Sequence, residues 1–224
     1  MKEDKKRIID LEFVKNSFKF SCLILIAATF ITFIEALKTD NKKARHILNL
    51  ETAVSLVASY VYSVFASMVD KEDFSLEKVT LYRYMDWVIT TPMLLLALLL
   101  FISYLNKDEL HLKNFLFVVL LNFGMLMSGY FGETGQINKY LALFGGFAFY
   151  ISLFLFIWFV YIHGKGIKIQ KIVFLFFITV WSMYGVAFMF DEYTKNLTYN
   201  ILDIIAKVFF GLFMWVFYGG VMIY

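Results

Sequence analysis

The sequence predicts an all-α membrane protein, a bundle of seven transmembrane helices. Apolar residues make up 61% of the 224 residues, and the mean hydropathy is +0.71. Soluble domains are about 45–50% apolar, so a large soluble core does not explain this composition. The apolar stretches are long and do not alternate with polar residues, which favours helices over the strands of a transmembrane barrel.

The first four apolar stretches are separated by charged connections. A basic loop at residues 38–46 follows the first stretch, and a charged segment at residues 70–78 follows the second. Stretches of about 17–25 apolar residues are long enough for a helix to cross the hydrocarbon core of a bilayer. We expect the first four transmembrane helices at residues 20–37, 47–69, 79–105 and 115–131.

The last three apolar stretches are separated in the same way. The segment GKGIKIQK, residues 164–171, ends the fifth, and DEYTKN, residues 191–196, ends the sixth. We expect these helices at residues 140–163, 172–190 and 200–224. The connections are short and the chain has no convincing internal repeat, so residues 1–224 are predicted to form a single seven-helix domain.

Residues 1–19 precede the first predicted helix and are strongly charged. The apolar residues scattered among these charges predict a short amphipathic helix on the membrane surface. No small-residue cleavage site follows a short apolar core, so we expect no cleavable signal peptide.

The distribution of lysine and arginine predicts the orientation of the chain. With the N-terminus outside, the first, third and fifth loops face the cytoplasm. They then hold Lys38, Lys42, Lys43, Arg45, Lys107, Lys113, Lys165, Lys168 and Lys171, whereas the opposite loops hold only Lys71, Lys78, Lys139 and Lys195. The positive-inside rule therefore predicts an outside N-terminus and a cytoplasmic C-terminus, although the basic N-terminal tail violates the rule.

The last apolar stretch carries two charged residues, Asp203 and Lys207. They are four positions apart, so they share one face of a helix. A charge near the bilayer centre costs about 2.5–3.5 kcal/mol, part of which an ion pair offsets. Two interpretations are open from this helix alone. Either Lys207 is a reactive buried amine whose charge Asp203 holds, or the pair is structural and fixes how the helix packs.

The third predicted helix also carries ionisable residues, in LYRYMDWVITTPMLLLALLL, residues 81–100. Asp86 and Thr90 are one turn apart and share a face, on which Ala97 also lies. Arg83 lies one turn before Asp86 and is close enough to reach it. A carboxylate inside a membrane-spanning segment is rare, which favours a functional role for Asp86 over a structural one.

Four segments of the sequence carry a resemblance to one family. They are RYMDWVITTP at residues 83–92, GMLMSGYFGETG at residues 124–135, WSMY at residues 181–184 and LDIIAKVFFG at residues 202–211. Together they resemble the microbial (type 1) rhodopsins, which are retinal proteins of seven helices, and the second segment resembles proteorhodopsins. The resemblance touches four of the seven predicted helices in the right order.

The resemblance implies that all-trans retinal is bound in the centre of the bundle. Lys207 would form the retinal Schiff base, with Asp86 as primary counterion and proton acceptor and Asp203 as second carboxylate. Thr90 would form a hydrogen bond near Asp86, and Arg83 would gate the outward side. The implied retinal pocket consists of Lys207, Trp87, Thr91, Leu94, Met125, Gly129, Trp181 and Tyr184, with Tyr62 leaning towards Asp203. A polyene favours such an aromatic, dry slot.

The sequence departs from the family's proton pumps at Ala97, where those pumps usually carry the carboxylate that serves as internal proton donor. Glu51 lies three turns inward from Tyr62 and is a candidate replacement, because a carboxylic acid in an apolar site stays protonated at neutral pH. Some viral rhodopsins resemble this arrangement, including an arginine at the position of Arg45. Glu51 could instead line a channel, or be a helix-end carboxylate bonded to Asn49 or neutralised by Arg45.

These features favour a light-driven outward proton pump. A passive light-gated cation channel is the alternative, because Glu51, Ser55, Ser59 and Asn49 form a polar stripe on the second helix. A photosensor with a separate transducer and a transporter without retinal also stay open. The expected partners are retinal, the lipid bilayer, protons or small cations, and further copies of the chain in a homo-oligomer. We expect no enzymatic reaction, no metal site and no nucleic-acid binding.

Overall fold

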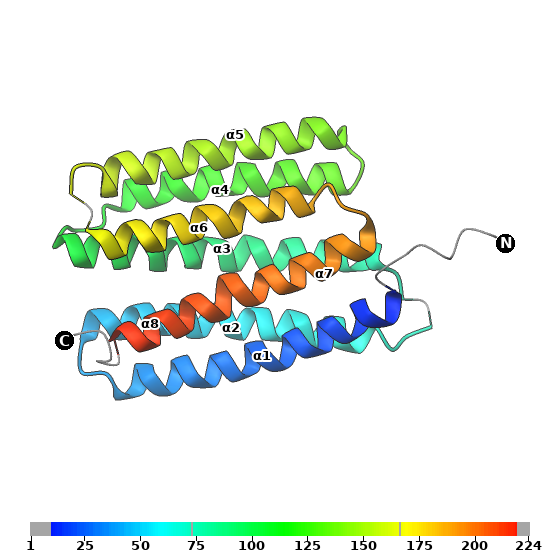
Figure 1. The fold of residues 1–224 in the computed structure, drawn as a ribbon, viewed down its shortest axis with the longest axis horizontal. Coiled ribbons are helices and arrows are strands. Elements are labelled where there is room, and N and C mark those ends of the chain that lie inside the picture. Colours follow the sequence, from blue (N-terminus) through cyan, green and yellow to red (C-terminus); the bar gives the residue numbers. More distant parts are fainter. Residues whose placement is uncertain (1–9, 73, 166, 219–224) are drawn as a thin grey trace.

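The structure, a computed structural model, describes residues 10–72, 74–165 and 167–218. Within these ranges seven helical spans are long and apolar enough to cross a membrane. They pack side by side, and each runs opposite to the one before it (Figure 1). The prediction of an all-α membrane protein with seven helices is therefore confirmed.

The first six spans and the seventh differ in regularity. The first six are α1 (Leu11–Lys38), α2 (Lys42–Met68), α3 (Leu76–Asn106), α4 (Leu112–Glu133), α5 (Lys139–Ile157) continued by η1 (Trp158–Ile162), and α6 (Lys168–Ala187). The seventh consists of α7 (Glu192–Asp203), η2 (Ile204–Phe209) and α8 (Phe210–Tyr218). The segments η1 and η2 are π-helical turns. Such turns are rare in proteins, and those that occur often lie at functional sites. Lys207 lies in η2.

Several helices begin at a side chain that caps their free backbone N–H groups. The Asp10 carboxylate accepts a hydrogen bond from the backbone N–H of Phe13 at 2.7 Å, and α1 starts there. Asp191 caps α7 in the same way. Hydrogen bonds from Thr194, and from the backbone N–H of Tyr193, lower the pKa of the Asp191 carboxyl because they stabilise its charged form.

The prediction for the start of the first helix was wrong. Residues 11–19 continue α1 as one helix, instead of forming a separate amphipathic segment that precedes a span beginning at Phe20. Val14 and Phe18 are fully buried against the rest of the bundle, so the charged residues around them occupy only the outer face. The first nine residues of the predicted segment lie outside the described part of the chain.

The seventh helix also begins earlier than predicted, at Glu192 instead of residue 200. The polar side chains of Lys195, Asn196 and Asn200 are buried inside the bundle, where they contact other polar groups. An apolar stretch therefore does not mark this part of the helix. The predicted end, at residues 219–224, lies outside the described residues. The second to sixth predicted helices differ from the observed ones by five residues or fewer at each end.

The bundle closes because α7 contacts both α1 and α6 (Figure 1). We call the end of the bundle at which α1, α3, α5 and α7 begin the Leu11 end, and the opposite end the Lys38 end. On α3, Arg83 precedes Asp86 and so lies towards the Leu11 end. On α2, which runs in the opposite direction, Glu51 lies towards the Lys38 end.

Candidate functional site

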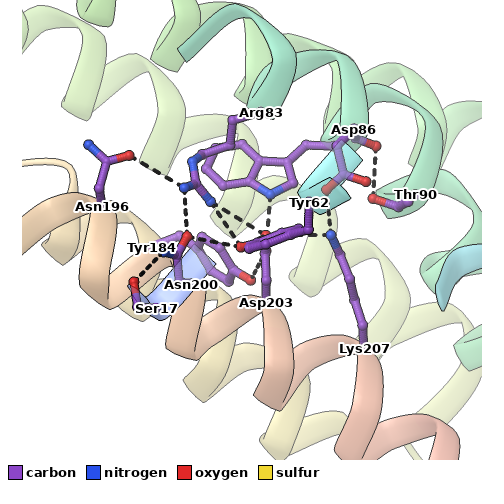
Figure 2. A network of polar contacts seen from close by, with 11 residues as sticks. Ser17, Tyr62, Arg83, Asp86, Thr90, Tyr184, Asn196, Asn200, Asp203 and Lys207 are labelled. Atoms are coloured by element: carbon purple, nitrogen blue, oxygen red, sulfur yellow. Dashed lines mark hydrogen bonds and ion pairs between the residues drawn. The ribbon is translucent and has the colours of Figure 1, made fainter. Parts of the chain in front are cut away.

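The Lys207 side chain is buried inside the bundle and faces α3. Its Nζ atom lies 2.5 Å from Oδ2 of Asp86, and both side chains are 1% exposed. Asp203 is one turn before Lys207, and its Oδ2 atom lies 3.6 Å from Nζ. Figure 2 shows Asp86 and Asp203 approaching the same amine from two helices. The structure thus brings together three of the four ionisable residues singled out in the third and last apolar stretches.

Asp203 is held by three aromatic side chains. The hydroxyl groups of Tyr62 and Tyr184 donate hydrogen bonds to its carboxylate at 2.8 and 2.7 Å, and the indole N–H of Trp87 donates a third at 3.1 Å. Hydrogen bonds to a carboxylate favour its charged form. These three donors therefore fix the position of the Asp203 carboxylate beside Lys207.

Arg83 lies on the Leu11 side of this group. Its Nη1 atom is 3.5 Å from Asp203 Oδ2, and its Nη2 atom donates to Asn200 Oδ1 at 2.8 Å. The Asn200 amide in turn donates to Ser17 of α1 at 2.7 Å (Figure 2). Aromatic rings surround the guanidinium group at 5.3–5.9 Å from their centroids: Phe18, Tyr62, Phe65, Trp87 and Tyr199.

The buried charges of the site balance. Arg83 and Lys207 carry two positive charges, and Asp86 and Asp203 carry two negative ones. All four are at most 2% exposed. Burying unpaired charges would cost several kcal/mol for each ion, so pairing is what makes the cluster tolerable inside a membrane protein. A proton that moves between Lys207 and Asp86 leaves this total unchanged.

Thr90 and Thr91 turn their hydroxyl groups back onto α3. Thr90 Oγ1 donates to the backbone carbonyl of Asp86 at 2.8 Å and not to its carboxylate. Thr91 Oγ1 donates to the carbonyl of Trp87 and accepts a hydrogen bond from Asn122 Nδ2 at 2.8 Å. The second oxygen of Asp86, Oδ1, has no hydrogen-bond partner among the residues that the structure describes. This oxygen is open to a further donor.

Glu51 lies apart from this cluster, on the Lys38 side of Lys207. Its side chain is fully buried, and neither carboxyl oxygen has a hydrogen-bond partner in the described part of the chain. The alternative that Asn49 or Arg45 satisfies this carboxyl is therefore wrong. Asn49 is exposed, and Arg45 donates to the backbone carbonyl of Thr39. A buried carboxyl without a partner is expected to be protonated.

Gly211 shows where Glu51 lies along the seventh span relative to Lys207. A Cβ atom placed on Gly211 would lie 3.5 Å from Oε2 of Glu51. Gly211 is four residues after Lys207, which corresponds to about 6 Å along a helix. Asp86 and Glu51 therefore lie on opposite sides of the amine, towards the Leu11 end and the Lys38 end respectively.

A cavity of about 820 Å³, measured to its open mouth, extends from Lys207 between the helices. The predicted pocket residues that line it are Trp87, Thr91, Leu94, Met125, Gly129, Trp181, Tyr184 and Lys207. Tyr62 is not among the lining residues, because its hydroxyl group points to Asp203. The cavity fits a long apolar ligand whose polar end lies at Lys207.

Gly129 shows how closely this cavity is shaped. A Cβ atom there would lie 2.5 Å from the hydroxyl oxygen of Tyr84, which also lines the cavity. A side chain at this position would therefore displace Tyr84, whose ring packs against that of Trp87 with centroids 5.1 Å apart.

Sequence reasoning missed the wall of the cavity that α5 supplies. Leu143, Phe147 and Tyr150 line the cavity and are spaced by four and three residues, which places them on one helix face. The regular apolar composition of α5 hid this face. Asn196 and Asn200 were also missed, although with Asp203 and Lys207 they form a stripe spaced by four, three and four residues.

A second buried ion cluster lies near the Leu11 end. Lys195 Nζ lies 2.6 Å from Glu133 Oε2 and 2.6 Å from Glu192 Oε1. The side chains of Lys195 and Glu133 are 3% and 7% exposed. The cluster ties the end of α4 to the start of α7.

Comparison with known proteins found a matching family model, related sequences and similar solved structures. The family model described as bacteriorhodopsin-like protein matches residues 12–219. The green-light absorbing proteorhodopsin of the gamma-proteobacterium EBAC31A08 is 25% identical over 219 residues, which cover 89% of this chain and 84% of that protein. Opsin-1 of Neurospora crassa is 29% identical over 149 residues, and the chain spans about half of its length, 47%.

Two solved structures show how similar the fold is. The crystal structure of viral rhodopsin OLPVRII matches with a TM-score of 0.87 and 35% identity, covering 93% of this chain and 99% of that one. The blue light-absorbing proteorhodopsin from Med12 matches with a TM-score of 0.78 and 22% identity, covering 95% and 100%. At that lower identity the match speaks for the fold alone.

Proposed function

This chain belongs to the bacteriorhodopsin-like family of microbial rhodopsins, and on that premise we propose that it is a light-driven pump that moves protons outward across the membrane. It is an integral, multi-pass membrane protein. The observation that carries the proposal is the position of the Lys207 amine between two buried carboxyl groups of different kinds. Asp86 is paired with the amine on one side, and Glu51 is unpaired on the other.

The family implies retinal as the chromophore, and the cavity beside Lys207 fits it. When attached through a protonated Schiff base, all-trans retinal supplies light absorption and a light-driven change of shape. Trp87, Trp181 and Tyr184 would hold the polyene between aromatic walls and exclude water, and Lys207 Nζ would carry the proton that is transported.

Asp86 is proposed to accept that proton. Its Oδ2 atom is already in contact with Nζ, and its Oδ1 atom is open. Asp203 is proposed to stay ionised and to hold the site's charge, because three donors satisfy it. Arg83 would then respond to the loss of charge on Asp86 and pass the proton towards the Leu11 end.

Glu51 is proposed to return a proton to Lys207. Its buried, unpartnered carboxyl stores a proton, and it lies beside Gly211, four residues after Lys207 in the direction of the Lys38 end. Ser55 is one turn from Glu51 on the same face of α2, and its buried hydroxyl group also lacks a partner among the described residues. The Ser55 hydroxyl and the Glu51 carboxyl would thus provide two successive polar groups for a proton that moves towards Lys207.

The remaining parts of the proposal concern the orientation of the protein in the membrane, its domain and its assembly. The Leu11 end faces the outside and the Lys38 end the cytoplasm, as the loop charges predict. Residues 1–224 act as one domain and assemble with further copies of the chain. We propose no enzymatic reaction.

A cation channel is the second candidate, and one observation favours it. Glu51, Ser55 and Ser59 form a buried polar stripe along α2, which could become wet. Asn49, which the sequence added to this stripe, is exposed and does not contribute. In this alternative Glu51 lines a pore and does not return a proton to Lys207.

A voltage-clamped photocurrent from retinal-loaded cells tests the proposal. With symmetrical solutions, a pump gives a current that stays outward at every accessible voltage, including zero. A current that reverses near zero supports the channel instead. A coloured protein without current supports a photosensor, and a protein that gains no visible absorbance with retinal supports a transporter of another kind.

A further inference from the structure

The direct route from the Lys38 end to Lys207 is closed by apolar side chains. Ala97, Phe101 and Phe210 are at most 2% exposed and belong to one packed cluster between α3 and α8. The ring of Phe101 lies 5.8 Å from that of Phe213 and 5.2 Å from that of Phe217. A proton cannot pass through packed rings without polar groups or water, so this route offers no path to Lys207.

A polar group lies instead to one side, where α1, α2 and α8 meet. A Cβ atom on Gly211 would lie 3.5 Å from Glu51 Oε2 and 3.3 Å from Thr32 Cγ2, so both side chains lie against the same glycine. Thr52 Oγ1 donates a hydrogen bond to Thr32 Oγ1 at 3.0 Å. Thr32 is fully buried. The methyl group of Thr32 therefore lies across Gly211 from the Glu51 carboxyl, and the hydroxyl groups of Thr32 and Thr52 join α1 to α2 beside it.

The next polar pair lies one turn farther towards the Lys38 end. Glu35 is three residues after Thr32 on α1, and Trp215 is four residues after Gly211 on α8. The indole N–H of Trp215 donates to Oε2 of Glu35 at 3.0 Å. Trp215 is 40% exposed, whereas Glu51 is fully buried. Glu35 is itself partly exposed, so this acid has access to the outside of the bundle, whereas the buried acid Glu51 has none.

We propose that Glu35 is the proton-uptake residue that refills Glu51, through a side entrance between α1 and α8. Glu51 gives its proton towards Lys207 and becomes a carboxylate. Glu35 then transfers a proton past Thr32 and Thr52 to Glu51, and takes up a replacement from the aqueous phase at the Lys38 end. Trp215 is a positioning residue that holds the Glu35 carboxyl over this entrance. The proposal rests on the proposed function, in which Glu51 returns the proton.

The test follows proton uptake from solution after a light flash, with a pH-indicator dye and the retinal-loaded protein in lipid vesicles. Glu35→Gln keeps the size of the side chain but removes the acid, and is expected to slow uptake about tenfold. Glu35→Asp keeps the acid and is expected to stay within about threefold of the unaltered chain. Asp40→Asn is the matched control, because it removes an exposed acid at the same end, and it should leave uptake unchanged.

A second variant tests the geometry without removing an acid. Trp215→Phe deletes the N–H that holds Glu35 and is expected to slow uptake about threefold. Azide, a small weak acid, should restore the rate in Glu35→Gln, which a purely structural defect would not allow. Unchanged uptake in Glu35→Gln overturns the role of Glu35 and leaves the pump intact. An unaltered chain that takes up no proton overturns both proposals.

Discussion

Asp86 and Asp203 face the same amine but are hydrogen-bonded very unequally. Asp203 accepts hydrogen bonds from three aromatic side chains, whereas Asp86 accepts only that of Lys207 and keeps one oxygen open. Protonating Asp203 would disturb three donors, and protonating Asp86 disturbs none besides Lys207. This asymmetry supports the proposed roles of Asp86 as proton acceptor and of Asp203 as fixed charge.

Asp86→Asn tests that assignment. The amide cannot accept the proton, so light-driven proton transport into retinal-loaded vesicles should fall by about 100-fold or more. Asp108→Asn is the control, because Asp108 pairs with Lys165 at the exposed surface. Transport that persists at the normal rate in Asp86→Asn would show that another group is the acceptor.

Glu51→Gln tests the proposed donor. Its side chain keeps the shape of glutamate but stores no proton, so reprotonation at Lys207 Nζ should slow by about 10- to 100-fold. Flash spectroscopy of the retinal-loaded protein measures this rate directly. A matched control is Glu77→Gln, at the exposed start of α3. Unchanged decay of the photocycle would remove Glu51 from the pathway.

Lys195→Met tests the second ion cluster. The substitution leaves Glu133 buried without its cation, which costs about 3–5 kcal/mol in known cases. The midpoint of thermal unfolding in detergent should fall accordingly. Lys165→Met breaks a pair whose side chains are 46% and 42% exposed, and should cost less than about 1 kcal/mol. Equal losses in the two variants would mean that the Lys195 cluster contributes little to stability.

Asp191→Ala tests the cap of α7 and predicts a dependence on pH. Loss of the cap should cost about 1 kcal/mol at neutral pH. Because folding lowers the pKa of Asp191, its contribution is present above the pKa of the unfolded chain, about 3.9, and is lost as the pH falls through the lowered value. The difference in melting temperature between Asp191→Ala and the unaltered chain should therefore shrink in strong acid. A difference that grows in acid would contradict this account.

The sequence predicted the parts of the site that contrast with their surroundings. Asp86 and Lys207 stand out because ionisable groups are costly in an apolar helix, and that contrast is visible without a structure. Glu51 was found in another way, through the resemblance, as a candidate replacement for the proton donor that Ala97 cannot supply. The resemblance to microbial rhodopsins then predicted that Asp86 of α3 lies next to Lys207 of the seventh span. The structure places these two side chains in contact.

Other parts could not be predicted, for two physical reasons. The start of α7 is polar because its side chains face partners inside the protein, so an apolar pattern does not mark it. The ion pair of Lys195 and Glu133 joins residues 62 positions apart, and only the packing of α4 against α7 brings them together. Long-range contacts of this kind leave no local signal in the sequence.

The π-helical turn at Ile204–Phe209 separates the seventh span into two halves. The turn sets how far one half is rotated about the helix axis relative to the other. Such a turn accommodates one additional residue, and one residue corresponds to about 100° of rotation in an α-helix. Deleting Val208 or Phe209, which follow Lys207 in the turn, would let the helix run on without interruption and would rotate the far half by that angle. Gly211 would then move away from the Glu51 side chain, while Lys207 stayed in the half that holds Asp203. A deletion at this point would therefore change the surroundings of Glu51 and leave the charge balance around Arg83 as it is.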